Sequence, residues 1–347
     1  MTATPDADTP ALETRALEVE FRTRSGDVAR AVDGVNLAVH RGEILALVGE
    51  SGCGKTTLAR TILGLQRPAA GAVYVGGEKL SYRARDLKAY RRRAQLILQD
   101  PSGALNPRHT VYEAVAEGLR VHGLHEGEEA KVADALSRAG LRPPERFYLR
   151  YPHELSGGQR QRVVIAGALV LDPEIIVADE PVSSLDASVR GEILALLLRL
   201  RDELGLTLLV VTHDLGLAWN IADRVAVMYL GRIIEIGPTE EILAAPQHPY
   251  TQALLSVGPI SMMRPRYITA TRSAMFHASP RSWVTTSNVR PSSSRNRSSR
   301  ARISPRTDAS RLETGSSATM ISGSSTSAPA ITTRWRCPPE SSCGYLR

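Results

Sequence analysis

One eight-residue segment of the chain has the pattern of a phosphate-binding loop, G-x-x-x-x-G-K-[ST]. It reads Gly49-Glu50-Ser51-Gly52-Cys53-Gly54-Lys55-Thr56 and continues into Thr57, which we count with the nucleotide contacts. Glycines let backbone N–H groups converge on phosphate oxygens, and the start of a helix adds partial positive charge. We expect Lys55 to reach the β- and γ-phosphates of a nucleotide, and Thr56 to offer Mg²⁺ a hard oxygen ligand. The alternative is a glycine-rich turn without a ligand, which the agreement of pattern and flanks disfavours.

Two acidic residues follow a second apolar segment. Residues 175–178 read Ile-Ile-Val-Ala, as in a buried strand, and Asp179 and Glu180 come next. Asp179 is placed to hold Mg²⁺, usually through water. Glu180, one residue later, points in a different direction from Asp179 and can orient or deprotonate a water molecule that attacks a phosphate. A helix cap or turn is the alternative for this pair.

Two polar residues follow further apolar segments. His213 comes after residues 208–211, at the carboxyl end of a strand, where open parallel sheets bind ligands. We expect it to hydrogen bond to a γ-phosphate and to hold Glu180 and water in place. Gln99 follows residues 96–98 and could touch Mg²⁺ or water, so that it senses the γ-phosphate. Either residue alone is weak support for a nucleotide site, because a lone His or Gln usually has a structural role.

A short glycine motif, Leu155-Ser156-Gly157-Gly158-Gln159, lies between the phosphate loop and the acidic segment. With this motif and Ser183-Ser184-Leu185-Asp186, the chain resembles the ABC-type ATPases. The resemblance assigns residues 49–56 to Walker A, Gln99 to the Q-loop, residues 155–159 to the signature, residues 175–180 to Walker B, residues 183–186 to the D-loop and His213 to the switch histidine.

The resemblance implies a head-to-tail dimer in which each ATP lies between Walker A of one subunit and the signature of the other. Ser156, Gly157 and Gly158 would donate hydrogen bonds to the partner's γ-phosphate, and Gln159 and Asp186 are counted with the nucleotide-binding residues. ATP and Mg²⁺ are the implied cofactors. ATP binding would close the dimer and hydrolysis would release it, so a monomer should hydrolyse ATP poorly.

A finer resemblance is to the ATP-binding subunits of oligopeptide, dipeptide and nickel importers. It rests on Asp100-Pro101 and Leu105-Asn106-Pro107-Arg108 after Gln99, and on Pro246-Gln247-His248-Pro249-Tyr250-Thr251. The implied partners are a second ATPase subunit, identical or paralogous, two transmembrane permease subunits and, indirectly, an extracytoplasmic substrate-binding protein, but no nucleic acid. The permease contact is expected around residues 101–117, which places the chain at the cytoplasmic face of the membrane.

The alternative function is that of a soluble ABC ATPase in translation or DNA repair. Repair members carry long coiled-coil insertions, and none lies between Gln99 and Leu155. Translation members usually carry two cassettes in one chain, whereas this chain has one.

Alternating buried strands and helices predict an α/β fold, that of the P-loop NTPases. We expect a flexible leader at residues 1–14 and an ATPase domain at residues 15–260. Its RecA-like parallel sheet core would carry an N-terminal antiparallel β subdomain and a helical insertion at about residues 100–165. The signature helix is expected over residues 159–169. Phe21 is the one aromatic residue before the phosphate loop, and it either stacks on adenine or belongs to a strand core.

The last 87 residues differ in composition from the rest. Residues 261–347 contain 20 Ser, 14 Arg, no Lys and 3 acidic residues, whereas the first 260 residues carry 29 basic and 33 acidic side chains. The globular part is therefore mildly acidic and lacks a general nucleic-acid footprint. The Ser/Arg-rich tail should be disordered. Arg without Lys suggests out-of-frame translation; a genuine disordered basic tail and a tail that binds anionic lipid are the alternatives.

Overall fold

The computed structural model describes residues 9–22 and 27–257. The expected tail and most of the expected leader lie outside these residues. Strand β1 (Leu12–Arg22) begins inside the expected leader, because Leu12 is buried and pairs with both Val39 and Val75.

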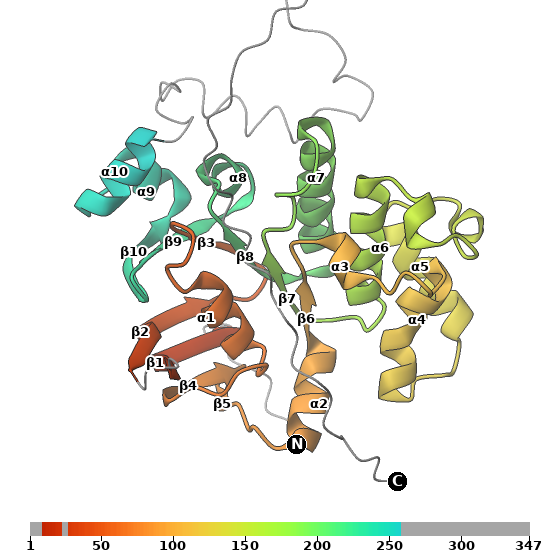
Figure 1. Cartoon of the computed structure of the whole chain (residues 1–347), viewed down its shortest axis with the longest axis horizontal. Coiled ribbons are helices and arrows are strands. Elements are labelled where there is room, and N and C mark those ends of the chain that lie inside the picture. Colours follow the sequence, from red (N-terminus) through yellow and green to blue (C-terminus); the bar gives the residue numbers. More distant parts are fainter. Residues whose placement is uncertain (1–8, 23–26, 258–347) are drawn as a thin grey trace, which may run out of the picture. The chain divides into compact units, whose positions relative to one another are not determined.

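The N-terminal antiparallel sheet is confirmed. Its strand order is β2-β1-β4-β5, with β2 at Val28–Val39, β4 at Ala70–Val75 and β5 at Glu78–Lys79 (Figure 1). The edges of this sheet are the long β2 and the two-residue β5, and β1 and β4 lie between them.

The second sheet has the order β10-β9-β3-β8-β7-β6, and its five strands from β9 to β6 run parallel (Figure 1). The antiparallel β10 closes one edge after a tight hairpin from β9. All residues of β3, β7 and β8 are buried, which explains their continuous apolar runs. The strands are β3 (Ile44–Val48), β6 (Ala94–Ile97), β7 (Ile175–Asp179), β8 (Thr207–Thr212), β9 (Arg224–Tyr229) and β10 (Arg232–Pro238).

The expected helical insertion is present between β6 and β7. The helices of the chain are α1 (Lys55–Ile62), α2 (Ala84–Arg93), α3 (Pro101–Ala104), α4 (Val111–His122), α5 (Glu128–Arg138), α6 (Gly157–Leu169), α7 (Ala187–Leu204), α8 (Leu215–Ile221), α9 (Thr239–Ala244) and α10 (Pro249–Val257). Two 3₁₀ turns, Pro144–Arg146 and Pro152–Glu154, lie between α5 and α6. Within the described residues, no helix is both long enough and apolar enough to cross a bilayer.

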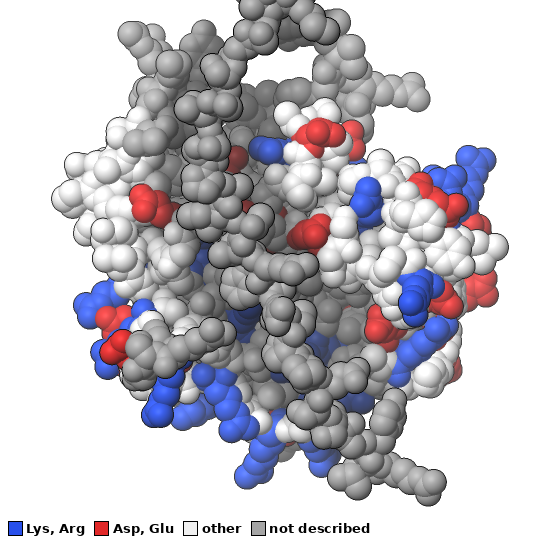
Figure 2. Space-filling model, in the orientation of Figure 1, with Lys and Arg blue, Asp and Glu red and all other residues white. Residues whose placement is uncertain are grey.

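Helix α2 was not predicted from the sequence. Its ten residues, ARDLKAYRRR, include five basic ones, and only Tyr90 is buried. So little apolar periodicity does not indicate a helix. Figure 2 shows basic side chains along the lower edge of the view, where Figure 1 places α2 and the antiparallel sheet.

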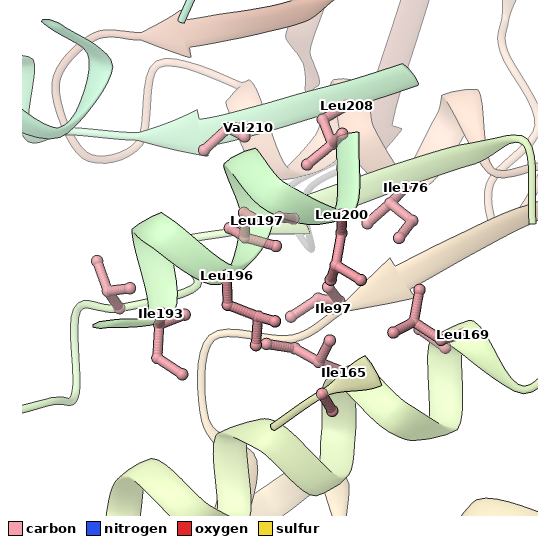
Figure 3. Packing of buried hydrophobic residues seen from close by; sticks show 14 of the residues in the cluster. Ile97, Ile165, Leu169, Ile176, Ile193, Leu196, Leu197, Leu200, Leu208 and Val210 are labelled. Carbon is pink, nitrogen blue, oxygen red and sulfur yellow. The ribbon is translucent and has the colours of Figure 1, made fainter. Parts of the chain in front are cut away.

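The parallel sheet is covered on both faces by different clusters. On one face, side chains of α6 and α7 pack against alternate strand residues such as Ile97, Ile176 and Leu208 (Figure 3). On the other face, Leu45 and Leu209 belong to a second cluster, with α1 and the antiparallel sheet. Burial on both faces holds the central strands β3, β7 and β8 in place, and with them the positions of their ends.

Leu197→Ala on α7 should lower the free energy of unfolding by about 2–5 kcal/mol, because Leu197 is fully buried and truncation leaves a cavity. Leu204→Ala, on the same helix but 37% exposed, is the matched control and should cost less than about 1 kcal/mol. Urea denaturation of the purified chain measures both. Equal losses in the two variants would contradict the packing described here.

Candidate functional site

The phosphate loop connects the buried strand β3 to α1 and is tightly packed from outside. A Cβ atom on Gly49 would lie 2.2 Å from the Met228 carbonyl oxygen, and one on Gly54 would lie 2.1 Å from that of Ala31. Gly52 has φ +83° and nothing within 4 Å of an added Cβ. Two of the loop glycines are therefore required by close backbone approach, and the third by its backbone conformation.

Lys55 is 6% exposed, and its ammonium group lies inside the loop. Nζ donates to the carbonyl oxygens of Gly49 at 2.8 Å and Glu50 at 2.7 Å, and lies 3.8 Å from the Cys53 Sγ. No carboxylate takes part in these contacts. A buried cation satisfied by backbone dipoles alone has positive charge left to offer to an anion.

Thr56 and Asp179 meet at the end of β7. The Thr56 hydroxyl donates to Oδ1 of Asp179 at 3.3 Å, across 123 residues of sequence. Burial raises the pKa of Asp179, which is 9% exposed, against the lowering effect of the Thr56 hydrogen bond. A hard cation bound here would relieve the cost of a buried carboxylate. The two oxygen donors fit Mg²⁺, which usually takes one or two protein ligands together with substrate phosphates.

Glu180 is held between the two neighbouring strands. His213 Nδ1 lies 2.8 Å from Oε1 of Glu180, and Gln99 Nε2 donates to Oε2 at 3.0 Å. Glu180 has φ +47°, a strained conformation for a residue with a side chain, and its N–H donates to the Val211 carbonyl oxygen at 2.8 Å. The structure thus brings together the three residues that the sequence assigned to water and γ-phosphate.

The imidazole of His213 has one nitrogen to spare. A carboxylate only accepts, so Nδ1 is the donor in this pair, and Nε2 makes no hydrogen bond to Glu180. The His213 side chain is 59% exposed and that of Glu180 is 17% exposed. The Ser184 hydroxyl also donates to the Gln99 carbonyl oxygen at 3.3 Å, which ties the D-loop to this group.

The signature motif caps its own helix. The Gln159 N–H donates to the Ser156 hydroxyl at 3.2 Å, and the Ser156 N–H donates to the Gln159 side chain at 3.0 Å. Helix α6 therefore begins at Gly157, two residues before the predicted start, because Ser156 is its N-cap. A Cβ on Gly158 would lie 2.6 Å from the side chain of Val189 in α7.

Three other residues named in the sequence analysis as nucleotide contacts, or as a candidate for one, lie at the start of α7, in α1 and in β1. Asp186 is exposed and is the N-cap of α7, without a side-chain capping bond. Thr57 lies in α1, where its carbonyl oxygen accepts from the Thr61 hydroxyl. Phe21 is 43% exposed near the end of β1, so the interpretation of it as a core residue is wrong.

Tyr250 also belongs to this site, although no sequence pattern indicates it. The Glu50 N–H of the phosphate loop donates to the Tyr250 hydroxyl at 3.1 Å. The segment around Tyr250 indicates only a resemblance to an importer group. A contact across 200 residues leaves no pattern in the neighbouring sequence that could predict it.

The described surface also has a cavity of about 390 Å³ between Arg41, Pro173 and Thr207, among others. It lies at the amino ends of β7 and β8. The residues described above gather at the carboxyl ends of the strands, on the opposite edge of the sheet.

Two family models match the chain. The model described as ABC transporter matches residues 32–183, and the model described as oligopeptide/dipeptide transporter, C-terminal region, matches residues 234–275. The second match continues past residue 260, where the sequence suggests that the ATPase domain ends.

Curated relatives are similar over most of the chain. A Brucella ovis protein named as a peptide import ATP-binding protein is 47% identical over 255 residues, which are 73% of this chain and 80% of that protein. The glutathione import ATP-binding protein GsiA of Salmonella paratyphi A is 46% identical over 271 residues, 75% of this chain and 43% of that longer protein.

Two solved structures share the fold. CbiO1 from Clostridium perfringens, part of the ABC transporter complex CbiONQ, gives a TM-score of 0.62 at 28% identity, covering 76% of this chain and 99% of that one. The ATP-binding cassette MJ0796, in a dimeric post-hydrolysis state with ADP and Pi, gives 0.59 at 30% identity, covering 66% of this chain and 98% of that one.

Asp179→Asn should raise the Tm of the nucleotide-free chain at pH 7. A raised pKa means that the native state disfavours the charged carboxylate, so a neutral side chain of the same shape removes a penalty. The gain should shrink as the pH falls from 7 toward the ordinary value of 3.8, because the wild-type carboxyl becomes protonated too. Calorimetry of both chains over this pH range measures the effect. A lower Tm at pH 7, or a gain independent of pH, would contradict it.

Proposed function

The chain belongs to the ATP-binding proteins of the ABC transporter family, and from that premise we propose how its residues hydrolyse ATP and which assembly they serve. The observation that carries the mechanism is the Glu180 carboxylate, held between Gln99 and His213 at the ends of three adjacent strands.

Glu180 orients the attacking water and accepts its proton as the water oxygen bonds to the γ-phosphorus. The bond between the γ-phosphorus and the bridging oxygen breaks, which leaves ADP and phosphate. His213 keeps Glu180 in place through Nδ1–H. Its exposed imidazole also provides the hydrogen bond to the γ-phosphate.

The phosphate loop binds and neutralises the nucleotide. Backbone N–H groups at the start of α1 face the phosphates, and Lys55 leaves the loop carbonyls to contact the β- and γ-phosphates. Thr56 and Asp179 would hold Mg²⁺, which would supply charge neutralisation at the phosphates. Phe21, exposed on β1, is the candidate to stack on adenine.

The second half of each site comes from another chain. Ser156, Gly157 and Gly158 bind the γ-phosphate held by the partner's phosphate loop, since the first N–H groups of α6 point outward from its N-terminus. Asp186, exposed at the start of α7, faces the same interface. The MJ0796 cassette is itself a dimer in its solved structure, which supports this arrangement.

The assembly we propose is an importer of peptides or related small compounds. The relatives are named for peptide and glutathione import, and nothing in these matches supports the soluble alternative. Two permease subunits then hold the ATPase pair at the cytoplasmic face of the membrane. They contact the insertion around residues 101–117, and an external binding protein delivers the substrate. Nickel, which the resemblance also allows, is not named in these relatives.

Glu180→Gln should lower the rate of phosphate release by about 100-fold or more, because the amide cannot accept the proton of water. ATP binding should persist, and gel filtration with ATP should show a stable dimer. Glu145→Gln, an exposed carboxylate in the helical insertion, is the control and should keep wild-type turnover. Unchanged turnover in the Glu180 variant would refute the role proposed for this residue.

Mixing two inactive chains tests the shared site. Lys55→Ala removes the phosphate-loop cation and Ser156→Arg blocks the signature, so each variant alone should be nearly inactive. In a mixed dimer, one composite site combines the two intact halves, and up to about a quarter of wild-type activity should return if the chain pairs with itself. A mixture no more active than its components would rule out a dimer of identical chains in the head-to-tail arrangement.

A further inference from the structure

The C-terminal part of the described chain holds the phosphate loop from outside at three places. The Glu50 N–H donates to the Tyr250 hydroxyl at 3.1 Å, and the Gly231 N–H donates to the Cys53 carbonyl oxygen at 2.9 Å. Gly49 packs so closely on the Met228 backbone that a Cβ would not fit. Strand β9, the turn after it and helix α10 therefore form one support behind the loop.

Tyr250 is itself well fixed. Its ring lies against that of Tyr229, with centroids 4.2 Å apart and planes tilted by 35°. Its N–H donates to Nδ1 of His248 at 3.0 Å. Glu235 of β10 accepts from the N–H groups of Gln247 at 2.8 Å and His248 at 3.2 Å, which anchors the segment that leads into α10. Burial raises the pKa of the Tyr250 phenol, so the group is a neutral hydroxyl at physiological pH.

The peptide group between Gly49 and Glu50 is bound at both ends. Its carbonyl oxygen accepts from Lys55 Nζ at 2.8 Å, and its N–H donates to Tyr250. In a trans peptide these two groups point in opposite directions, so the plane is fixed between Lys55 and Tyr250. When Lys55 turns to the phosphates, the carbonyl loses its partner and the Tyr250 bond remains to hold the plane.

We propose that Tyr250 is a positioning residue of the ATP site: its hydroxyl holds the Gly49–Glu50 peptide so that the phosphate loop keeps its shape when Lys55 moves to the nucleotide. The C-terminal region thereby sets the affinity of the phosphate loop. The proposal rests on ATP binding by this loop.

Tyr250→Phe tests it, because only the hydroxyl is removed and the ring contact with Tyr229 is kept. One lost hydrogen bond should raise the Kd of the purified full-length chain for Mg²⁺–ATP by about 5-fold. Amide hydrogen exchange in a peptide spanning Glu50 should become faster, while the Tm without nucleotide should stay as in the wild type. Tyr112→Phe is the matched control, since it removes a hydroxyl that donates to Glu128 at 3.2 Å in the helical insertion.

The outcomes separate cleanly. A higher Kd for Mg²⁺–ATP together with faster amide exchange around Glu50, seen in Tyr250→Phe but not in Tyr112→Phe, supports the positioning role. A wild-type Kd in this variant overturns it, and so does an equal loss in Tyr112→Phe. Wild-type protein that fails to bind Mg²⁺–ATP at all would instead refute the function proposed for the phosphate loop, whatever the variants do.

Discussion

Backbone hydrogen bonding between four parallel strands positions the phosphate loop together with Gln99, Asp179, Glu180 and His213. In register, Val48 of β3 pairs with Thr212 of β8, and Ala178 of β7 pairs with Val210 of β8 and Ile97 of β6. Adjacent strands are about 4.8 Å apart, so residues that leave neighbouring ends come within hydrogen-bonding reach of one another. A slip of one residue in β7 would turn its side chains to the opposite faces and separate Glu180 from both partners. Strand β8 also stabilises the strained backbone conformation of Glu180, because the Val211 carbonyl oxygen accepts the Glu180 N–H.

This constraint explains how much the sequence could predict. A strand buried on both faces is a short apolar run, and a polar residue directly after it must lie at the sheet edge. Asp179, His213 and Gln99 were therefore placed correctly from their neighbours alone. Helix α2 was missed for the converse reason. Its apolar contacts with the protein are made by Tyr90 and the half-buried Leu87, and two such residues among five basic ones do not set a period.

Contacts that depend on chain geometry could not be predicted. Nothing in the residues around Tyr250 indicates that its hydroxyl reaches Glu50, since the contact exists only after β9, β10 and α10 have packed. The exposure of Phe21 was open for the same reason: an aromatic residue in an alternating strand faces the core or the solvent according to register. The start of α6 was two residues off because Ser156 acts as both N-cap and signature residue, and the functional motif concealed the ordinary capping pattern.

That double role has a mechanical consequence. The capping bonds between Ser156 and Gln159 use the third N–H of the helix, and helix geometry leaves the N–H groups of Gly157 and Gly158 facing outward, as an anion from another chain requires. The same turn is connected to the segment after Gln99 by Arg160, which donates to the Leu155 carbonyl oxygen and, at 2.8 Å, to the hydroxyl of Ser102. Ser102 lies in α3, whose N-cap Asp100 directly follows Gln99. A shift of Gln99 would therefore reach the signature motif through α3 and Arg160.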